Sequence, residues 1–178
     1  MVDDAWLFAY GSLLWDPGFG PAEAVRAGLR GWRRSFCMWS IHWRGTPEAP
    51  GLVLALEADA GGSCEGVALR LPPEDRDAIL GAVRARELVS DAYEERRLPV
   101  VLADGREVEA LAYVVRERHP QHARLGAEAQ ARIIAEARGE RGLNRDYLAR
   151  TAARLRELGI VDAEVEALLG RVGALAPG

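Results

Sequence analysis

Lysine is absent from the sequence, so all 23 strongly basic side chains are arginines. An enzyme that forms a Schiff base needs a lysine amine, and a P-loop needs a lysine to reach the nucleotide phosphates. The absence excludes pyridoxal-phosphate enzymes of the usual kind and P-loop nucleotide-binding proteins. In a chain rich in arginine, alanine and glycine, this absence most simply reflects a GC-rich genome, and we interpret it as mutational bias.

Cysteine and histidine are scarce as well. Cys37 and Cys64 form no Cys-x-x-Cys pair, and the histidines are His42, His119 and His122. These residues do not have the spacing of a zinc site or a redox dithiol, so we predict no metal site. A structural disulfide is not expected in a cytosolic protein. We expect both cysteines to be buried, inert thiols.

A basic surface and a membrane-spanning run are also missing. The net charge is −4 and 28% of the residues are charged, which gives no field for nucleic acid or anionic lipid. The N-terminal segment Met1–Asp4 is acidic and lacks the order of a secretory signal. We therefore expect a single domain over residues 1–178, a cytoplasmic location and no obligate protein partner.

An apolar run, Trp6–Tyr10, predicts a short buried strand that breaks at Gly11-Ser12 into a tight turn. Glycine supplies backbone torsions that other residues avoid, and it allows a ligand to approach the main chain. Successive backbone N–H groups in such a turn can bind a carboxylate or an oxyanion. We call residues 10–15 the donor turn. Trp6 is predicted to lie in the core.

Further strands precede a helical C-terminal part. One long segment is predicted to hold either two strands or one bent strand, and two hairpins are predicted across glycine-containing turns. The segments are residues 24–43 for the first, 52–58 with 64–71 across 59–62, and 96–101 with 107–115 across 103–105.

Helices are indicated by apolar spacing and capping residues. One starts near Glu74 and buries Ile79, Leu80 and Val83, and another covers residues 127–138. Two more are expected to start at side-chain caps, Asn144 and Asp162. Strands followed by helices indicate an α+β fold.

Several segments, in order along the chain, resemble the γ-glutamylcyclotransferase family, and in particular its ChaC-type, glutathione-specific branch. The resemblance spans about residues 6–169. The segments that carry it are Tyr10–Trp15, Arg44–Gly51, Ser63–Ala68, Arg86-Glu87 with Tyr93, Asn144–Leu148 and Leu158–Ile160. It implies a small mixed β-barrel flanked by helices.

Glu87 has two interpretations. From the sequence alone it is an ordinary surface glutamate paired with Arg84 or Arg86, since most glutamates are solvated. The resemblance implies instead that Glu87 is the catalytic acid and base, a role suited to a carboxylate at a helix C-terminus. Glu94 and Glu95 are interpreted as solvated strand-edge charges.

The resemblance also implies a reaction without metal or organic cofactor. The free α-amine of glutathione attacks its own γ-glutamyl carbonyl and releases 5-oxoproline and Cys-Gly, and orientation alone can supply about 7–11 kcal/mol. Arg44 could bind the glycine carboxylate or only brace the fold. The substrate-binding residues implied are Ala9, Tyr10, Gly11, Ser12, Leu13, Leu14, Arg44 and Tyr93.

Two alternatives remain open from the sequence. The turn and Glu87 would recognise only the γ-glutamyl end, so another γ-glutamyl amide could be the substrate. A catalytically silent γ-glutamyl-binding module is the other alternative. Ser12 is not predicted to be a nucleophile, because no neighbouring residue in the sequence would activate it.

Overall fold

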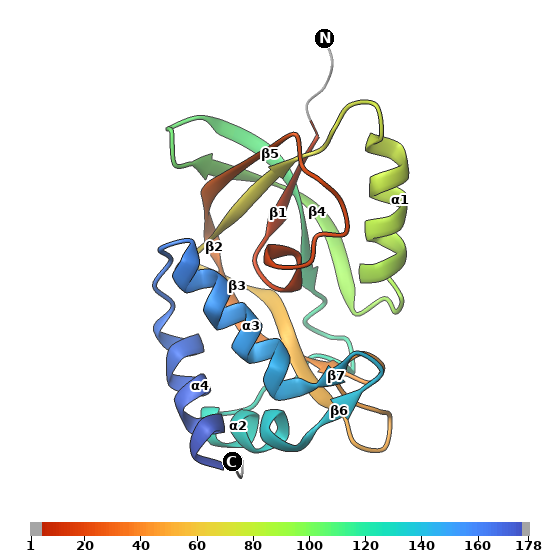
Figure 1. The fold of residues 1–178 in the computed structure, drawn as a ribbon, viewed down its shortest axis with the longest axis vertical. Coiled ribbons are helices and arrows are strands. Elements are labelled where there is room, and N and C mark those ends of the chain that lie inside the picture. The colour runs from red at the N-terminus through yellow and green to blue at the C-terminus, as the bar shows by residue number, and fades with distance from the viewer. Residues whose placement is uncertain (1–4, 176–178) are drawn as a thin grey trace. The chain divides into compact units, whose positions relative to one another are not determined.

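The computed structural model describes residues 5–175, which divide into two compact units. We call residues 5–35 and 55–119 the barrel unit, and residues 36–54 and 120–175 the helical unit. Figure 1 shows the helices and strands that make up the two units. Met1–Asp4, where the sequence predicts no secretory signal, lie outside the described residues. The single domain over residues 1–178 stays a prediction.

The barrel unit contains a closed, mixed β-barrel. Its strand order is β1 (Trp6–Ala9), β3 (Gly51–Arg70), β2 (Glu23–Ser40), β4 (Tyr93–Leu102) and β5 (Glu107–Val115). Strand β1 runs antiparallel to β3 and parallel to β5. This arrangement confirms the predicted small mixed barrel.

Every residue of β1 is buried, as the apolar run predicted. Trp6 is 3% exposed, which confirms its assignment to the core. Because β1 has neighbours on both edges and buried side chains on both faces, it is a rigid base for the residues that follow it. The donor turn begins immediately after this strand.

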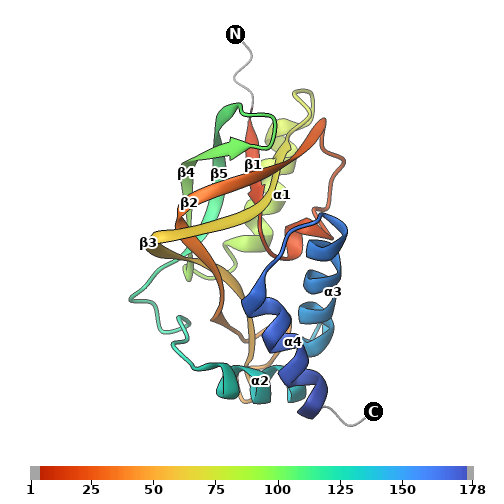
Figure 2. The same ribbon diagram turned by 90° about the vertical axis from the view of Figure 1, so that its left-hand side faces the viewer.

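Strand β2 is a single bent strand, which selects one of the two predicted alternatives. Gly31 lies within it at φ +82°. Only glycine adopts this region readily, and a glycine of this kind in a strand interior is typical of a bulge or bend. Figure 2 shows β2 beside its neighbour β3.

The predicted hairpin over residues 52–71 is wrong. Residues Gly51–Arg70 form one continuous strand, β3, and residues 59–62 lie inside it rather than in a turn. A two-residue hairpin turn needs a positive φ, and neither Gly61 nor Gly62 has one. The glycine pair therefore lies in extended backbone.

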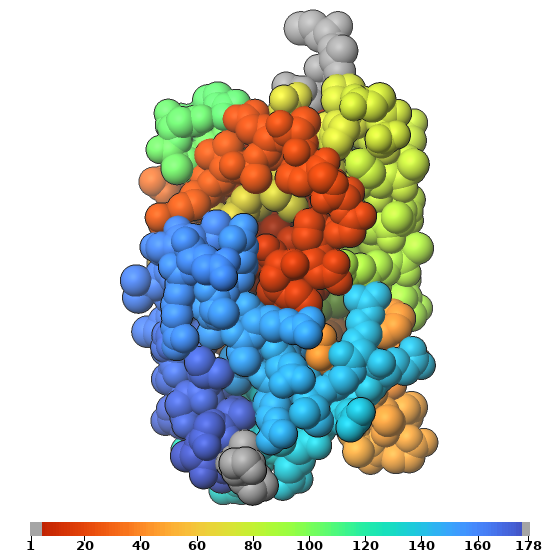
Figure 3. Space-filling view, in the orientation of Figure 1, coloured from red at the N-terminus to blue at the C-terminus, as the bar shows by residue number. Residues whose placement is uncertain are grey.

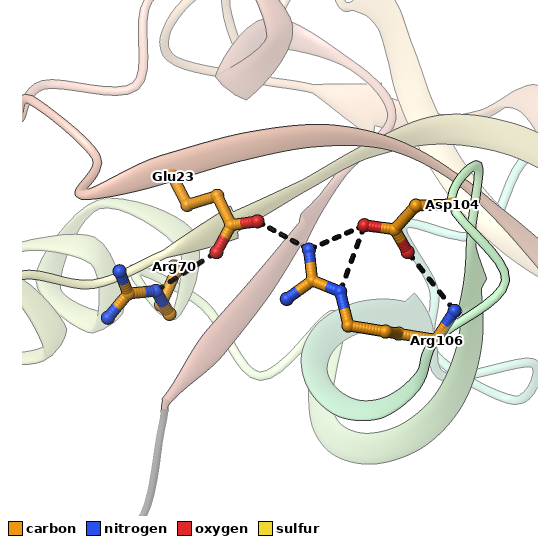
Figure 4. A network of polar contacts seen from close by, with 4 residues as sticks. All are labelled: Glu23, Arg70, Asp104 and Arg106. Atoms are coloured by element: carbon orange, nitrogen blue, oxygen red, sulfur yellow. Dashed lines mark hydrogen bonds and ion pairs between the residues drawn. The ribbon is translucent and has the colours of Figure 1, made fainter.

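The second predicted hairpin is confirmed. Strands β4 and β5 pair along their length, and Gly105 in the turn has φ +91°. Arg106 donates hydrogen bonds from Nε and Nη2 to Asp104 at 2.9 and 2.7 Å. It also binds Glu23 of β2, which in turn accepts a bond from Arg70 of β3 (Figure 4). This ionic network ties the turn to two other strands.

One helix, α1 (Arg76–Glu87), belongs to the barrel unit and lies alongside β4 (Figure 1). Val83 is buried as predicted, whereas Ile79 and Leu80 are only half-buried. The helix ends where the amide of Leu88 donates to the carbonyl of Arg84. Glu87 is thus the last helical residue, at the position the sequence predicted.

The helical unit contains α2 (Ala127–Glu136), α3 (Asn144–Glu157) and α4 (Ala163–Leu175), which pack against one another (Figure 2). A short two-stranded sheet, β6 (Arg138–Gly139) and β7 (Gly142–Leu143), was not predicted. Along residues 5–175, no helix is long and apolar enough to cross a membrane. Both cysteines are buried, as expected.

The two predicted helix caps have different outcomes. Asp162 accepts a bond from the amide of Val165 at 3.0 Å, which confirms its capping role. Asn144 is the first residue of α3 and not its cap, so that prediction is wrong. Its side chain instead accepts from the amide of Leu52 at 2.8 Å and donates to the carbonyl of Leu52 at 2.7 Å.

Candidate active site

The donor turn leaves β1 and continues as a short 3-10 helix, η1 (Ser12–Leu14). Gly11 is buried and has φ −129° and ψ −127°. Its φ is negative, so Gly11 does not lie in the left-handed region. The amide of Leu14 donates to the carbonyl of Gly11 at 3.0 Å, and the amide of Asp16 donates to the carbonyl of Ser12 at 2.8 Å.

The first two amides of η1 have no hydrogen-bond acceptor among the described residues. Neither the Ser12 nor the Leu13 N–H donates a hydrogen bond to another of the residues between 5 and 175. The first N–H groups of any helix lack internal acceptors and are commonly satisfied by side chains, water or a ligand. Two such donors side by side can bind an anion, as predicted for this turn.

Tyr10 anchors the turn to the barrel. Its hydroxyl donates to the carbonyl of Tyr113 in β5 at 2.6 Å, and its own carbonyl accepts from Nε of Arg34 at 2.7 Å. Arg34 is 7% exposed and also binds the carbonyl of Glu65. A Cβ added at Gly66 would collide with the carbonyl of Ala9. The Ser63–Ala68 motif therefore lets β3 approach β1 closely just before the turn.

Glu87 is largely buried, with 15% of its side chain exposed. One carboxylate oxygen lies 3.4 Å from Nε of Arg86. The pairing matches the ordinary interpretation of Glu87, but the burial does not, because a surface glutamate would be well solvated. Burial and the neighbouring Glu95 raise the pKa of the Tyr113 phenol, and the negative charge of Glu87 adds to this shift.

Arg86 joins the helix end to the donor turn. Its Nη2 donates to Oγ of Ser12 at 2.6 Å, and its Nη1 donates to the carbonyl of Asp16 at 2.6 Å. The red segment that follows β1 lies at the surface beside the yellow-green α1 (Figure 3). Ser12 and Glu87, 75 residues apart in sequence, thus share one guanidinium. The Ser12 hydroxyl accepts from a cation, an arrangement that does not activate it as a nucleophile.

A polar cluster beside this site was missed by the sequence analysis. Glu95 accepts hydrogen bonds from Nε and Nη2 of Arg84 at 2.9 and 2.8 Å, and from the hydroxyl of Tyr113 at 3.0 Å. Its side chain is 20% exposed, so its interpretation as a solvated strand-edge charge is wrong. Glu94, which pairs with Arg96, is more exposed at 34%.

The charges in this cluster are set by their partners. The bonds from Arg84, followed by the bond from Tyr113, hold the pKa of Glu95 below its usual range. Burial, reinforced by the Glu95 and Glu87 carboxylates, raises the pKa of Tyr113. Tyr113 is therefore a neutral hydrogen-bond donor. The pairing of Glu95 with Tyr113 could have been predicted from the β4–β5 hairpin. A hairpin whose strand register is centred on Asp104 places Glu95 directly opposite Tyr113.

The remaining predicted residues of the barrel unit lie near the ends of its strands. Ala9 and Leu14 are buried. Tyr93 is half-buried, begins β4 and pairs with Val115. Because side chains alternate along a strand, Tyr93 and Glu95 project from the same face of β4. A substrate contact by Tyr93 stays a prediction.

In the helical unit, Arg44 is 4% exposed. Its amide donates to Oγ of Ser40 at 2.9 Å, its Nη1 donates to the carbonyl of Leu143 at 3.1 Å, and its guanidinium lies 5.7 Å from the ring centre of Tyr147. Burial lowers the pKa of its guanidinium. These contacts favour the bracing role over binding of a substrate carboxylate, which stays a prediction.

Glycines make the Arg44–Gly51 loop compact. A Cβ at Gly45 would collide with the amide of Gly51, and one at Gly51 would collide with the carbonyl of Arg44. A Cβ at Gly139 would lie 2.6 Å from the amide nitrogen of Gly45. The loop is packed backbone against backbone, so its motif has a structural explanation.

The Asn144–Leu148 motif also has a structural role. Besides the two bonds of Asn144 to Leu52, the hydroxyl of Tyr147 accepts from the amide of Leu54 at 3.2 Å. Asn144 and Leu52 are both fully buried. These side chains hold the first residues of β3 within the helical unit.

Comparison with known proteins agrees with this architecture. The profile of the ChaC-like protein family matches residues 5–175. The chain is 37% identical to the glutathione-specific gamma-glutamylcyclotransferase of Escherichia coli over 96% of this chain and 73% of the relative. It is 32% identical to glutathione-specific gamma-glutamylcyclotransferase 1 of Homo sapiens, over 97% of this chain and 80% of the relative.

A solved structure shares the fold. The crystal structure of a yeast γ-glutamyl cyclotransferase specific to glutathione superimposes with a TM-score of 0.88 and 21% identity. The match covers 98% of this chain and 97% of the yeast chain. At this identity the likeness supports the barrel-and-helix fold, and the sequence matches carry the relation to the family.

Proposed function

Since the chain belongs to the ChaC-like protein family, we propose that it degrades glutathione by cyclising the γ-glutamyl group, with Glu87 as the acid and base. The products are 5-oxoproline and Cys-Gly. One observation carries the proposal, namely that Arg86 donates a hydrogen bond to Ser12 of the donor turn and forms an ion pair with the Glu87 carboxylate. A proton-transfer group and a pair of anion-binding amides are thereby held in one site.

The donor turn supplies substrate binding in this proposal. The amides of Ser12 and Leu13 bind the α-carboxylate of the γ-glutamyl group or the oxyanion that forms at its γ-carbonyl. The backbone of residues 9–14 approaches the substrate, and Tyr93 contributes a side-chain contact. Binding in a folded conformer brings the α-amine to the γ-carbonyl carbon, the geometry that makes five-membered ring closure fast.

Glu87 moves protons between the two nitrogens. The α-nitrogen forms a bond to the γ-carbonyl carbon, and the bond from that carbon to the cysteinyl nitrogen breaks. The attacking ammonium nitrogen loses two protons in becoming a lactam N–H, and the departing amide nitrogen gains two in becoming an ammonium. Glu87 takes up one of these protons and returns one, so it ends the cycle in its starting form.

A direct test follows product formation. Purified protein is incubated with glutathione, and Cys-Gly and 5-oxoproline are quantified by mass spectrometry. Equal amounts of the two products are expected. Parallel incubations with γ-glutamyl-alanine and γ-glutamyl-lysine test whether another γ-glutamyl amide is preferred. Tight binding of glutathione with no product from any of the three compounds would support a silent binding module and overturn the proposal.

A further inference from the structure

We propose that Arg86 is a positioning residue for the reaction: its guanidinium fixes the Glu87 carboxylate relative to the donor turn. This inference rests on the proposed function. Arg86 would not touch the substrate itself. It would set where the proton-transfer group stands relative to the amides that bind the substrate.

The contacts use three sides of one guanidinium. Nη2 bonds Oγ of Ser12 and Nη1 bonds the carbonyl of Asp16, each at 2.6 Å. Nε faces Glu87 at 3.4 Å, and the Asp16 carboxylate lies 3.8 Å from Nη1. Only 16% of the Arg86 side chain is exposed, so the group is much less mobile than a solvated surface arginine.

The position of Glu87 explains why such a constraint is useful. Glu87 is the last residue of α1, and helix ends are the part of a helix that frays. The bond from Leu88 to the Arg84 carbonyl closes the last turn but does not orient the Glu87 side chain. Arg86 supplies that orientation, and it reaches across to a segment that starts from the rigid strand β1.

Arginine suits this task better than lysine would. A planar guanidinium offers donors in fixed directions, whereas an ammonium is a point charge on a flexible stem. One lysine could not hold the same geometry toward Ser12, Asp16 and Glu87 together. Arg86→Lys should therefore keep the charge and lose most of the alignment.

The test compares variants of Arg86 with a control on the same helix. Arg76, at the other end of α1, makes a pair with Asp77 at 3.6 Å and lies about 15 Å along the helix axis from Arg86. We expect Arg86→Gln to lower kcat by about 10²-fold, because small misplacements of a reacting group cost on that order. KM should change by less than about 3-fold if the donor turn still binds substrate. Arg76→Gln should leave both parameters at the wild-type level.

Arg86→Lys should regain less than about a tenth of the kcat that Arg86→Gln loses. Added guanidinium or methylguanidinium should restore part of the activity of Arg86→Ala, and should have no such effect on Glu87→Gln. Rescue of this kind would not follow if Arg86 mattered only for folding, and circular dichroism checks the fold of each variant.

A double-mutant cycle tests the path through Ser12. If Arg86 acts by joining Ser12 to Glu87, Ser12→Ala and Arg86→Gln should be strongly non-additive in kcat. The inference is overturned if folded Arg86→Gln matches Arg76→Gln, or if KM alone rises. Failure of the proposed function is a separate result, since wild-type protein would then release no Cys-Gly from glutathione.

Discussion

In the barrel unit, Arg86 donates hydrogen bonds to a hydroxyl and a backbone carbonyl and forms an ion pair with a carboxylate. The hydroxyl and the carboxylate belong to Ser12 and Glu87, which are predicted to act on substrate. In the helical unit, Arg44 is almost completely buried and is bonded to the Leu143 carbonyl and stacked near Tyr147. Both arginines stand in motifs that resemble one family. Only Arg86 contacts residues that take part in the proposed reaction.

The difference teaches how to interpret a motif residue. In the barrel unit, the matched residues include a carboxylate at a helix end and the amides of Ser12 and Leu13, which have no acceptor among residues 5–175. In the helical unit, the side chains of Arg44, Asn144 and Tyr147 hydrogen-bond to the backbone of the same unit. We therefore expect substitutions in the barrel unit to reduce turnover and those in the helical unit to reduce stability.

The largest effect expected is on turnover in Glu87→Gln. The amide keeps the size of the side chain and removes proton transfer, so kcat should fall by roughly 10²–10⁴-fold. The melting temperature should stay near that of the wild type. Glu94→Gln, which changes an exposed carboxylate paired with Arg96, is the matched control and should keep full activity. A folded Glu87→Gln variant with most of its activity would remove Glu87 from the mechanism.

The next effect is on stability, in Asn144→Ala. The change leaves the buried N–H and C=O of Leu52 without partners, and each such group costs about 1–3 kcal/mol. We expect the free energy of unfolding to fall by about 2–4 kcal/mol in urea titrations, with little change in kcat per folded molecule. Gln121→Ala, which removes one half-buried bond to the Trp39 carbonyl, should cost about 1 kcal/mol. Equal losses in the two variants would contradict the structural role of Asn144.

Arg44→Ala separates bracing from substrate binding. If Arg44 braces its loop, the free energy of unfolding should fall by about 2 kcal/mol, since a bond from a charged donor and a ring contact are lost. Activity on glutathione and on γ-glutamyl-alanine should then fall in proportion. A selective rise in KM for glutathione would instead establish the predicted contact with the glycine carboxylate and would break the contrast between the two units.

The smallest effect expected is on the pH dependence of stability through Glu95. Its pKa is lowered in the folded state from the ordinary value of 4.5, chiefly by Arg84. Its contribution to stability is therefore complete above about pH 4.5 and is lost as the pH falls through the lower folded-state pKa. Glu95→Gln should lower stability by about 1 kcal/mol at pH 7. The difference from wild type should shrink in urea titrations carried out below pH 4; a constant difference at every pH would rule out this linkage.

Local patterns were sufficient for much of the fold. The apolar run before Gly11, the Asp104-Gly105 turn and the cap at Asp162 each depend on neighbours in sequence, and each was predicted. The continuous strand β3 was not, because a glycine pair is compatible with both a turn and an extended strand. Barrel closure, which pairs β3 with distant strands, selects the extended form.

The site was predictable only in part for the same reason. Glu87 and the donor turn were found through a resemblance, and their connection through Arg86 depends on a contact between residues 12 and 86 that no local pattern contains. The environment of Glu95 depends on the cross-strand position of Tyr113 and on Arg84 of the neighbouring helix. The role of a side chain cannot be predicted from composition or periodicity when its partners are distant in sequence.

Because strands β2 and β3 both pass from one unit into the other, neither unit is a continuous stretch of the chain. A gene fragment that ends at residue 119 would carry residues 36–54 without the helices they pair with, and the complementary fragment would lack those residues altogether. Truncation therefore cannot deliver either unit intact. Each unit needs its own redesigned chain, in which a short linker joins residue 35 to residue 55 for the barrel unit, or residue 54 to residue 120 for the helical unit.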